Sequence, residues 1–331
     1  MTLAAVFALL VTAQAPGDSG GAGGALFQAW CKSCHGADGS GTPAATTRLE
    51  VPPADLKECK GSTAETEDRW VGVVTKGGAS FGLSLDMPAF GDAATPEQVR
   101  AVVRYARSLC GEPGWPPGEL NFPRPFLVEK AFPENEWVVT AARREQALVY
   151  ERRFGKRLQL EGEARTAFDS LDRPFDGVTA SVKYNLWHSL ERRALASLGL
   201  EATPPLGRQE NWEIEPFFAF GAQPGRALFV QGEIVASWEE TEGITAFSYR
   251  LGVGREVGRV VPMLEAGWMV PREGEHTLSL YPQMWVRLSR LGHVAASLGA
   301  ELPAVGPEPR HPRLIGFVLW DYGDAGLLRG W

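Results

Sequence analysis

Long apolar runs and basic clusters are both missing from this sequence, and each absence excludes a class of protein. No stretch reaches the roughly eighteen apolar residues of a membrane-spanning helix. Lys and Arg number 33 against 40 Asp and Glu, which gives a net charge of −7 without any basic run. Because nucleic acids are bound through basic surfaces, we exclude them as partners. The 331 residues, 44% hydrophobic and 22% charged, suffice for two folded domains.

The N-terminal residues have most features of an export signal. Leu3–Val11 is an apolar stretch, and Ala13-Gln14-Ala15 has the small-x-small pattern of a cleavage site. No Lys or Arg precedes the stretch, so an N-terminal helix of the first domain is the alternative interpretation. The glycine-rich stretch that follows is typical of a flexible spacer. We therefore predict a signal peptide over residues 1–15 and a spacer over residues 16–23.

Residues 24–112 show the patterns of a helical domain. Thr95, Pro96 and Gln98 combine a helix cap, a first-turn proline and a capping-box partner. These signals predict a helix from Pro96 to about Leu109, and this helix has an apolar face. The members of that face are Val99, Val102, Val103 and Ala106.

The boundary between two domains falls in a proline-rich stretch. Residues 111–135 contain six prolines, too many for a regular helix or strand. We predict a semi-rigid linker over residues 113–135. After Glu136 the hydrophobic period changes from 3.6 to 2, so we expect an all-β domain over residues 136–331.

The segments of this second domain alternate between apolar and polar residues. Between Val178 and Leu186, for example, the apolar residues alternate strictly with Thr, Ser, Lys and Asn. We count about ten to twelve strands of roughly ten residues with short connections, which indicates antiparallel pairing. Further segments begin near Leu158, Ala194, Trp212, Leu228, Phe247, Val260, Thr277, Val294 and Leu314.

Two architectures fit these strands: a sandwich with solvated polar faces, and a closed barrel in an outer membrane. Strands of about ten residues have the length that a membrane barrel needs. The polar faces carry both signs of charge, as at Glu233 and Arg250, which is more charge than a soluble core buries. We therefore predict a barrel of about twelve strands whose charges pair inside a narrow lumen. Within it, Pro216, Pro262 and Pro282 should mark bulges or lost ladder bonds.

Cys31-Lys32-Ser33-Cys34-His35 is the C-x-x-C-H motif of covalent heme attachment. The two thiols add across the heme vinyl groups, and their spacing on a helical turn gives the right separation. The adjacent His35 then lies under the iron as an axial ligand. A bare C-x-x-C could also be a zinc or redox pair, but the histidine and the export signal favour heme. We expect one covalent c-type heme, with Cys31 and Cys34 as its tethers.

Met87 is the candidate for the second axial ligand. It lies in a loop just before the capped helix and is followed by Pro88. A methionine is usually a core residue, but this loop setting favours a ligand. A thioether stabilises ferrous over ferric iron, so ligation by His35 and Met87 should raise the reduction potential.

With these motifs in order, residues 24–110 resemble a small class I cytochrome c: a helix with C-x-x-C-H-G, a central loop, an M-P-x-F loop and a closing helix. The resemblance implies that the closing helix crosses the first helix, with the aromatic ring of Tyr105 packed at the crossing. It also implies that a proline carbonyl accepts a hydrogen bond from the proximal His35. Pro52 and Pro53 are the candidates for that heme-pocket role.

Residues 111–331 resemble the barrel half of proteobacterial proteins that join such a cytochrome to an outer-membrane, transporter-like barrel. The stretch over residues 115–136, WPPGELNFPRPFLVEKAFPENE, is its most characteristic piece. The resemblance implies a location at the outer membrane, with membrane lipid as a partner of the barrel. A soluble periplasmic protein is the alternative.

Cys59 and Cys110 remain outside the heme motif. Spare cysteines of an exported protein often form a disulfide, and two unpaired thiols are the alternative. Closing a loop of about fifty residues would contribute on the order of 4 kcal/mol in the chain-entropy account.

These features predict an electron carrier rather than an enzyme. The heme would cycle between oxidation states in the periplasm and exchange electrons with redox proteins at a small, transient interface. An even number of strands would put both barrel ends on the periplasmic side. The alternative is an outer-membrane transporter or small pore with an accessory heme domain. A peroxidase is disfavoured, because Met87 would fill the position that peroxide needs.

Overall fold

The computed structural model describes residues 21–43, 46, 49, 51–112, 114–143, 145–168, 174–289, 292–307 and 311–323. The predicted signal peptide and the spacer up to residue 20 lie outside the described residues. Contacts divide the chain into two compact units: Met1–Lys57 with Trp70–Cys110, and Glu58–Arg69 with Gly111–Trp331. One division between the units falls between Cys110 and Gly111. Glu58–Arg69 nevertheless groups with the second unit, where the Thr63 carbonyl accepts a 2.8 Å hydrogen bond from Gly118 N–H.

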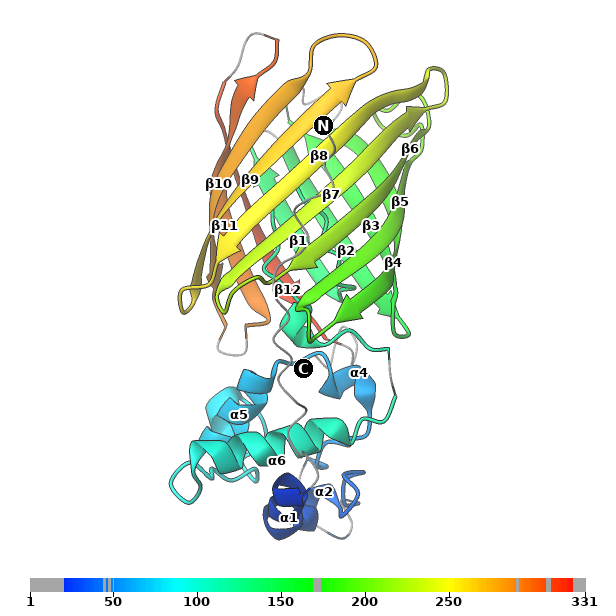
Figure 1. Ribbon diagram of the computed structural model, residues 1–331. Coiled ribbons are helices and arrows are strands. Elements are labelled where there is room, and N and C mark those ends of the chain that lie inside the picture. The colour runs from blue at the N-terminus through cyan, green and yellow to red at the C-terminus, as the bar shows by residue number, and fades with distance from the viewer. Residues whose placement is uncertain are drawn as a thin grey trace, which may run out of the picture. The chain divides into compact units, whose positions relative to one another are not determined.

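Short helices make up the first part of the chain (Figure 1). Their bounds are α1 Gly21–Trp30, α2 Lys32–His35, α4 Cys59–Ser62, α5 Glu67–Lys76, η1 Gly78–Phe81, α6 Pro96–Ser108 and η2 Gly118–Leu120. Among the described residues, no helix combines the length and the apolar character needed to cross a membrane.

Helix α6 begins as the sequence predicts. Thr95 N–H donates to Gln98 Oε1 at 2.9 Å, and Gln98 N–H donates to Thr95 Oγ1 at 3.3 Å, which completes the capping box. Pro96 occupies the first turn, where its missing N–H removes no helical hydrogen bond. The buried side chains of α6 are those of the predicted face: Val99, Val102, Val103 and Ala106.

Helix α1 packs against α6 through two glycines. A Cβ atom on Gly23 would overlap the Ala101 carbonyl oxygen, and one on Gly24 would lie 3.1 Å from the Tyr105 ring. The Tyr105 ring also contacts Phe27, with ring centroids 5.3 Å apart. The expected helix crossing at Tyr105 is therefore present. The spacer prediction was wrong at its end, because α1 begins at Gly21 and uses Gly23 for close backbone approach.

Substitution of Gly23 by valine is expected to destabilise the first unit by about 1–3 kcal/mol, the usual cost of overpacking a close contact. Urea unfolding followed by far-ultraviolet circular dichroism would measure the shift. Ala25→Val is the matched control, because Ala25 is exposed on the same helix and the substitution changes helix propensity without a clash. Equal unfolding midpoints for the two variants would contradict the crossing.

The second unit is a closed antiparallel barrel of twelve strands, as predicted, each paired with its sequence neighbour and β1 with β12 (Figure 1). Glu136 at the start of β1 lies opposite Asp321 at the end of β12, so both chain ends of the barrel share one rim. The strands are β1 Glu136–Ala142, β2 Glu145–Phe154, β3 Leu158–Ala167, β4 Phe175–Ser189, β5 Ala194–Thr203, β6 Glu213–Ala222, β7 Leu228–Glu239, β8 Gly243–Arg255, β9 Val260–Pro271, β10 Thr277–Arg287, β11 Val294–Val305 and β12 Arg313–Asp321.

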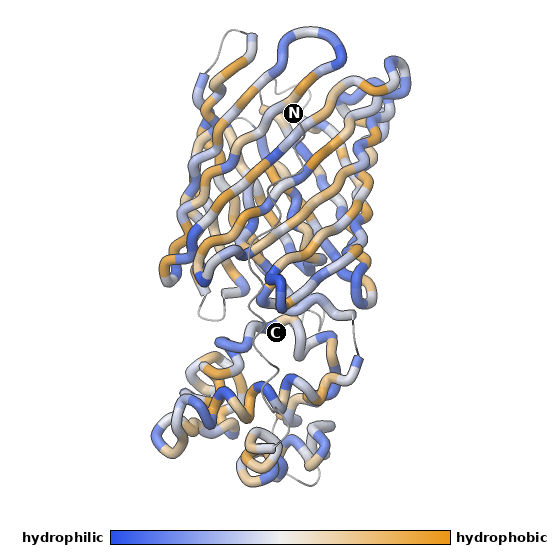
Figure 2. Tube along the Cα trace, in the orientation of Figure 1, coloured by the Kyte–Doolittle hydropathy of each residue, from blue (hydrophilic) through white to orange (hydrophobic). Residues whose placement is uncertain are grey.

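The outward surface of the barrel is mostly apolar, whereas its interior holds most of the polar strand residues together with an apolar cluster. Along β4, Val182 and Tyr184 are exposed whereas Lys183 and Asn185 are fully buried. Figure 2 shows hydrophobic and hydrophilic residues alternating along the strands. The outward apolar side chains include Val139, Leu148, Leu160, Leu186, Leu198, Leu200, Phe218, Ile234, Phe247, Leu251, Leu264, Met284, Leu298 and Val318. A water-soluble barrel would have the opposite arrangement, because it would bury its apolar faces.

The three prolines expected to disturb the strands, Pro216, Pro262 and Pro282, each lie where the pairing with one of the two neighbouring strands is interrupted. The pairing of β6 with β7 skips from Ile214 to Phe217, passing Pro216. The pairing of β10 with β11 similarly passes Pro282, and the pairing of β8 with β9 stops one residue before Pro262. These positions fit the expected lost ladder bonds, because proline has no N–H to donate.

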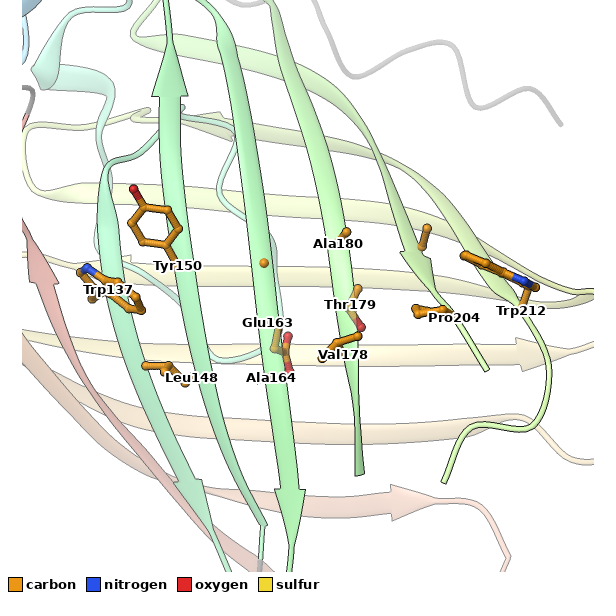
Figure 3. A pocket seen from close by; sticks show the side chains of 12 residues that line it. Trp137, Leu148, Tyr150, Glu163, Ala164, Val178, Thr179, Ala180, Pro204 and Trp212 are labelled. Atoms are coloured by element: carbon orange, nitrogen blue, oxygen red, sulfur yellow. The ribbon is translucent and has the colours of Figure 1, made fainter. Parts of the chain in front are cut away.

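The outer face of β1–β5 has a shallow apolar groove of about 420 Å³. Its lining contains the small residues Gly162, Ala164 and Ala180, with Trp137 and Trp212 at opposite ends (Figure 3). The groove includes none of the predicted heme residues and belongs to the outward apolar surface.

The proline-rich stretch is not a linker. Every described residue from Leu120 to Asn135 is buried or half-buried. Its backbone is hydrogen-bonded to inward-pointing side chains of the barrel, as where Gln231 Nε2 donates to the Pro123 carbonyl at 2.8 Å. The prolines suit this segment although it does not separate two domains. Each proline removes one N–H that would otherwise need a hydrogen-bond acceptor inside the barrel.

Candidate heme site

The C-x-x-C-H motif lies at the turn where α1 passes into α2. Cys31 N–H bonds to the Phe27 carbonyl at 2.9 Å, and His35 N–H bonds to the Cys31 carbonyl at 2.9 Å. Both cysteines of the motif are free thiols and are half-buried. Burial, with the neighbouring Cys34 as a second cause, raises the pKa of the Cys31 thiol to about 11. The helical turn thus presents two thiols and one imidazole within five residues, as the motif requires.

The imidazole of His35 is fixed by a backbone carbonyl. Its Nδ1 lies 3.1 Å from the carbonyl oxygen of Ala54, so with the proton on Nδ1 the Nε2 lone pair is available to a metal. The acceptor is the residue after Pro53, and the expectation that Pro52 or Pro53 would accept this bond was wrong. Any residue offers a carbonyl, so residue type does not reveal the acceptor. Pro53 instead packs beside Gly41, where an added Cβ would lie 3.0 Å from the Pro53 carbonyl oxygen.

The loop between the motif and Ala54 is held by turns and by one ion pair. Gly36 and Gly41 have φ values of 78° and 79°, which strongly favour glycine. The Asp38 carboxylate accepts hydrogen bonds from Ser40 and pairs with Lys57 at 3.0 Å. These bonds hold the pKa of Asp38 well below its usual range. The fixed loop keeps the Ala54 carbonyl opposite His35.

Met87 is held at its backbone by two glycines. Gly78 N–H donates to the Met87 carbonyl at 3.0 Å, and a Cβ on Gly77 would lie 3.0 Å from that same oxygen. Gly77 also has a φ of 77°, which favours glycine there. The Met87 side chain is half-buried. The sequence indicated Met87 as a candidate ligand. It did not indicate that Gly77 and Gly78 hold the Met87 backbone, because no motif includes these two glycines.

An aromatic stack joins the loop of Met87 to helix α1, which ends just before Cys31. Trp30, just before Cys31, stacks on Phe90 with ring centroids 5.4 Å apart and an interplanar angle of 18°. Phe90 N–H also bonds to the Val74 carbonyl at 2.9 Å. The stack therefore brings the segments of both predicted axial ligands against one apolar cluster. The cluster contains Phe27, Leu56, Val102 and Ala106, packed against Leu26, Trp30, Cys31, Trp70, Val74, Tyr105 and Leu109.

These residues fit a c-type heme. The donor set is two thiols, an imidazole nitrogen and a thioether, which are the groups that attach and ligate this cofactor. The flanking segments also expose large apolar side chains, with Leu85 85% exposed, although such side chains usually avoid water. Cys59 and Cys110, by contrast, are disulfide-bonded and offer no thiol.

Comparison with known proteins also identifies a cytochrome in this part of the chain. Residues 19–105 match the family "Cytochrome C oxidase, cbb3-type, subunit III". No curated protein matches the chain at a significant level.

The barrel is similar in outline to several solved outer-membrane structures. The KdgM porin is 9% identical and has a TM-score of 0.43, over 56% of this chain and 96% of that porin. The NanC porin is 7% identical with a TM-score of 0.44, over 56% and 98%. An outer membrane channel from Pseudomonas putida is 12% identical with a TM-score of 0.44, over 60% and 99%. Likenesses this distant carry no conclusion about what the barrel does.

The matched residues contain the C-x-x-C-H motif, the loop of Met87 and most of helix α6. Residues 19–105 therefore form a c-type cytochrome domain, and the chain continues into a closed barrel of twelve antiparallel strands.

Proposed function

We propose that this protein carries electrons in the periplasm through one covalently attached c-type heme and is held at the outer membrane by its barrel. The observation that carries the electron-transfer part is the C-x-x-C-H turn whose histidine is oriented by the Ala54 carbonyl. The match of residues 19–105 to a cytochrome family supports it.

Each residue of the site has a defined role in this proposal. Cys31 and Cys34 form the two thioether links, and His35 and Met87 are the axial ligands. The heme supplies one-electron exchange between ferrous and ferric iron. The Ala54 carbonyl keeps the His35 proton on Nδ1 and raises the basicity of Nε2. With Met87 in place no axial position is open to peroxide, so we assign electron transfer rather than peroxidase chemistry.

The outward apolar surface supports the membrane part of the proposal. A closed barrel has no free strand edge, and every backbone group can be paired within lipid. Because β1 begins and β12 ends at one rim, both barrel termini would face the same compartment. That compartment would be the periplasm, where the heme domain meets other redox proteins at a small, transient interface.

A transporter or small pore is the second candidate function. The observation that favours it is the set of charged side chains inside the barrel, of which Lys183, Glu233 and Glu265 are almost fully buried. A lumen that only had to be packed could be filled with apolar side chains at lower cost. The heme domain would then be an accessory to the barrel.

Fractionation with heme staining tests the main proposal. A denatured full-length band that stains for covalent heme is expected in the outer-membrane fraction, and the double variant Cys31→Ala/Cys34→Ala should lose the stain. The variant Ser33→Ala is the control, because it lies between the cysteines and removes neither thiol. A stained band in the soluble periplasm would overturn the membrane anchor, and an unstained wild-type band would overturn the covalent heme.

A further inference from the structure

The segment over residues 120–135, here called the lumen segment, is bound inside the barrel by specific groups of the wall. The Glu265 carboxylate accepts hydrogen bonds from three consecutive backbone amides. Phe126 N–H donates to Oε1 at 2.6 Å, and the N–H groups of Leu127 and Val128 donate to Oε2 at 2.9 and 3.0 Å. Glu265 is 1% exposed, so its charge is stabilised by these bonds rather than by water. Three bonds to one buried carboxylate fix this turn of the lumen segment.

Further wall residues hold the lumen segment from other sides. Glu233 on β7 accepts the Glu129 N–H at 3.2 Å. Lys183 on β4 donates to the Lys130 carbonyl at 2.6 Å, and Gln159 on β3 accepts the Glu134 N–H at 2.6 Å. Ser197 on β5 donates to the Ala131 carbonyl. The anchors thus come from several strands around the barrel, as a segment that crosses the lumen requires.

Buried ion pairs join the lumen segment to the wall. Arg124 pairs with Glu151 on β2, and Glu129 pairs with Lys183 at 2.5 Å. Lys130 lies 3.5 Å from Glu136 at the start of β1. Withdrawal of the segment would break these pairs and leave Glu151 and Lys183, both nearly unexposed, without their present partners.

The wall is also shaped for the segment's apolar side chains. A Cβ on Gly221 would lie 2.9 Å from the Phe122 ring, whereas one on Gly299 would meet both the Phe126 ring and, more closely, the Pro282 carbonyl oxygen of the wall. A Cβ on Gly267 would overlap the Leu127 side chain. Phe122 stacks on Phe229 of β7 with ring centroids 5.6 Å apart. Glycine at positions 221 and 267 makes room for these side chains that an empty lumen would not need.

From these contacts we propose that the lumen segment is a resident plug that keeps the barrel closed to ions and solutes, with Glu265 and Glu233 as its main anchors. A barrel of twelve strands is wider than an eight-stranded barrel, whose interior side chains fill, and narrower than the porins of sixteen or more strands, so one packed segment is enough to block it. The proposal of a plug depends on the membrane location proposed above, but it does not depend on the role of the heme. It also explains the buried charges of the wall without a transport path, because Lys183, Glu233 and Glu265 bind the lumen segment.

Conductance of the heme-loaded full chain in planar lipid bilayers tests the plug. Wild-type protein is expected to give no channel currents, whereas a variant with residues 122–134 replaced by a Gly-Ser sequence of equal length should give stable ones. The double variant Glu265→Ala/Glu233→Ala should open intermittently. Glu301→Ala is the matched control, because Glu301 also carries a wall carboxylate but pairs with Arg313. Wild-type currents equal to those of the replacement variant would overturn the proposal.

Hydrogen exchange of the detergent-solubilised protein gives a second readout that does not depend on bilayer insertion. The amides of residues 126–129 should exchange slowly in the wild type. Exchange should be faster by roughly tenfold or more in Glu265→Ala/Glu233→Ala, since loss of their acceptors weakens the closed state. Rapid exchange in the wild type would overturn the plug even if the replacement variant failed to fold. If the proposed membrane location is wrong, the protein will not associate with lipid, and this result is distinct from a barrel that inserts but is open.

Discussion

Replacement of Met87 by alanine is expected to lower the midpoint reduction potential of the protein. A thioether stabilises ferrous iron, and its loss leaves water or a weaker donor in its place. The fall should be a sizeable part of the roughly 0.8 V range over which axial ligands set heme potentials. The variant should also bind small external ligands such as cyanide faster than the wild type, because an axial position is now open. Potentiometric titration with absorbance detection would measure the first effect.

Met284→Ala is the matched control for this experiment. Met284 lies on β10 of the barrel with its side chain 45% exposed, so its loss should leave the potential unchanged. Covalent heme stain should persist in both variants, because neither substitution touches Cys31 or Cys34. A Met87→Ala protein with the native potential and spectrum would remove Met87 from the ligand set. The backbone hydrogen bond that Gly78 donates to the carbonyl of residue 87 does not depend on the Met87 side chain, so misfolding is not the expected cause of a change.

Local signals in the sequence predicted those parts of the structure that local interactions determine. The capping box at Thr95 and Gln98 needs only four consecutive residues, and the structure has both of its hydrogen bonds. The alternation around Lys183 likewise assigned side chains to two faces, and the buried and exposed residues follow it. In both cases the interactions that favour the residue type lie within a single helix or strand, so the local sequence is enough to predict them.

The parts that the sequence did not reveal depend on partners far along the chain. The lumen segment has the proline content of a linker, whereas its anchor Glu265 is more than 130 residues away from Phe126, Leu127 and Val128. Nothing in either stretch alone indicates that they meet. The acceptor of the His35 hydrogen bond was missed for a different reason, since Ala54 contributes a backbone carbonyl that every residue type possesses.

The substitution Leu298→Arg is expected to destabilise the barrel by about 2–4 kcal/mol if its outer face lies in lipid. Leu298 is 66% exposed near the middle of β11, where a lipid-facing charge would lie deep in the hydrocarbon layer. Folding into lipid vesicles, followed by denaturant titration, would measure the loss. Outer-membrane yield in the producing cell should fall as well.

Leu228→Arg distinguishes lipid from water as the solvent of this surface. Leu228 also points outward and is 41% exposed, but it is the first residue of β7 and lies opposite Arg255, the last residue of β8, so it lies at a rim. In a membrane the cost of a charge depends on its depth, so Leu228→Arg should cost only about 0–1 kcal/mol. In water both arginines would be solvated, and the two variants would then have nearly the same stability. A larger loss in Leu298→Arg would therefore arise from the hydrocarbon layer, because both substitutions place the same charge on the same outward face.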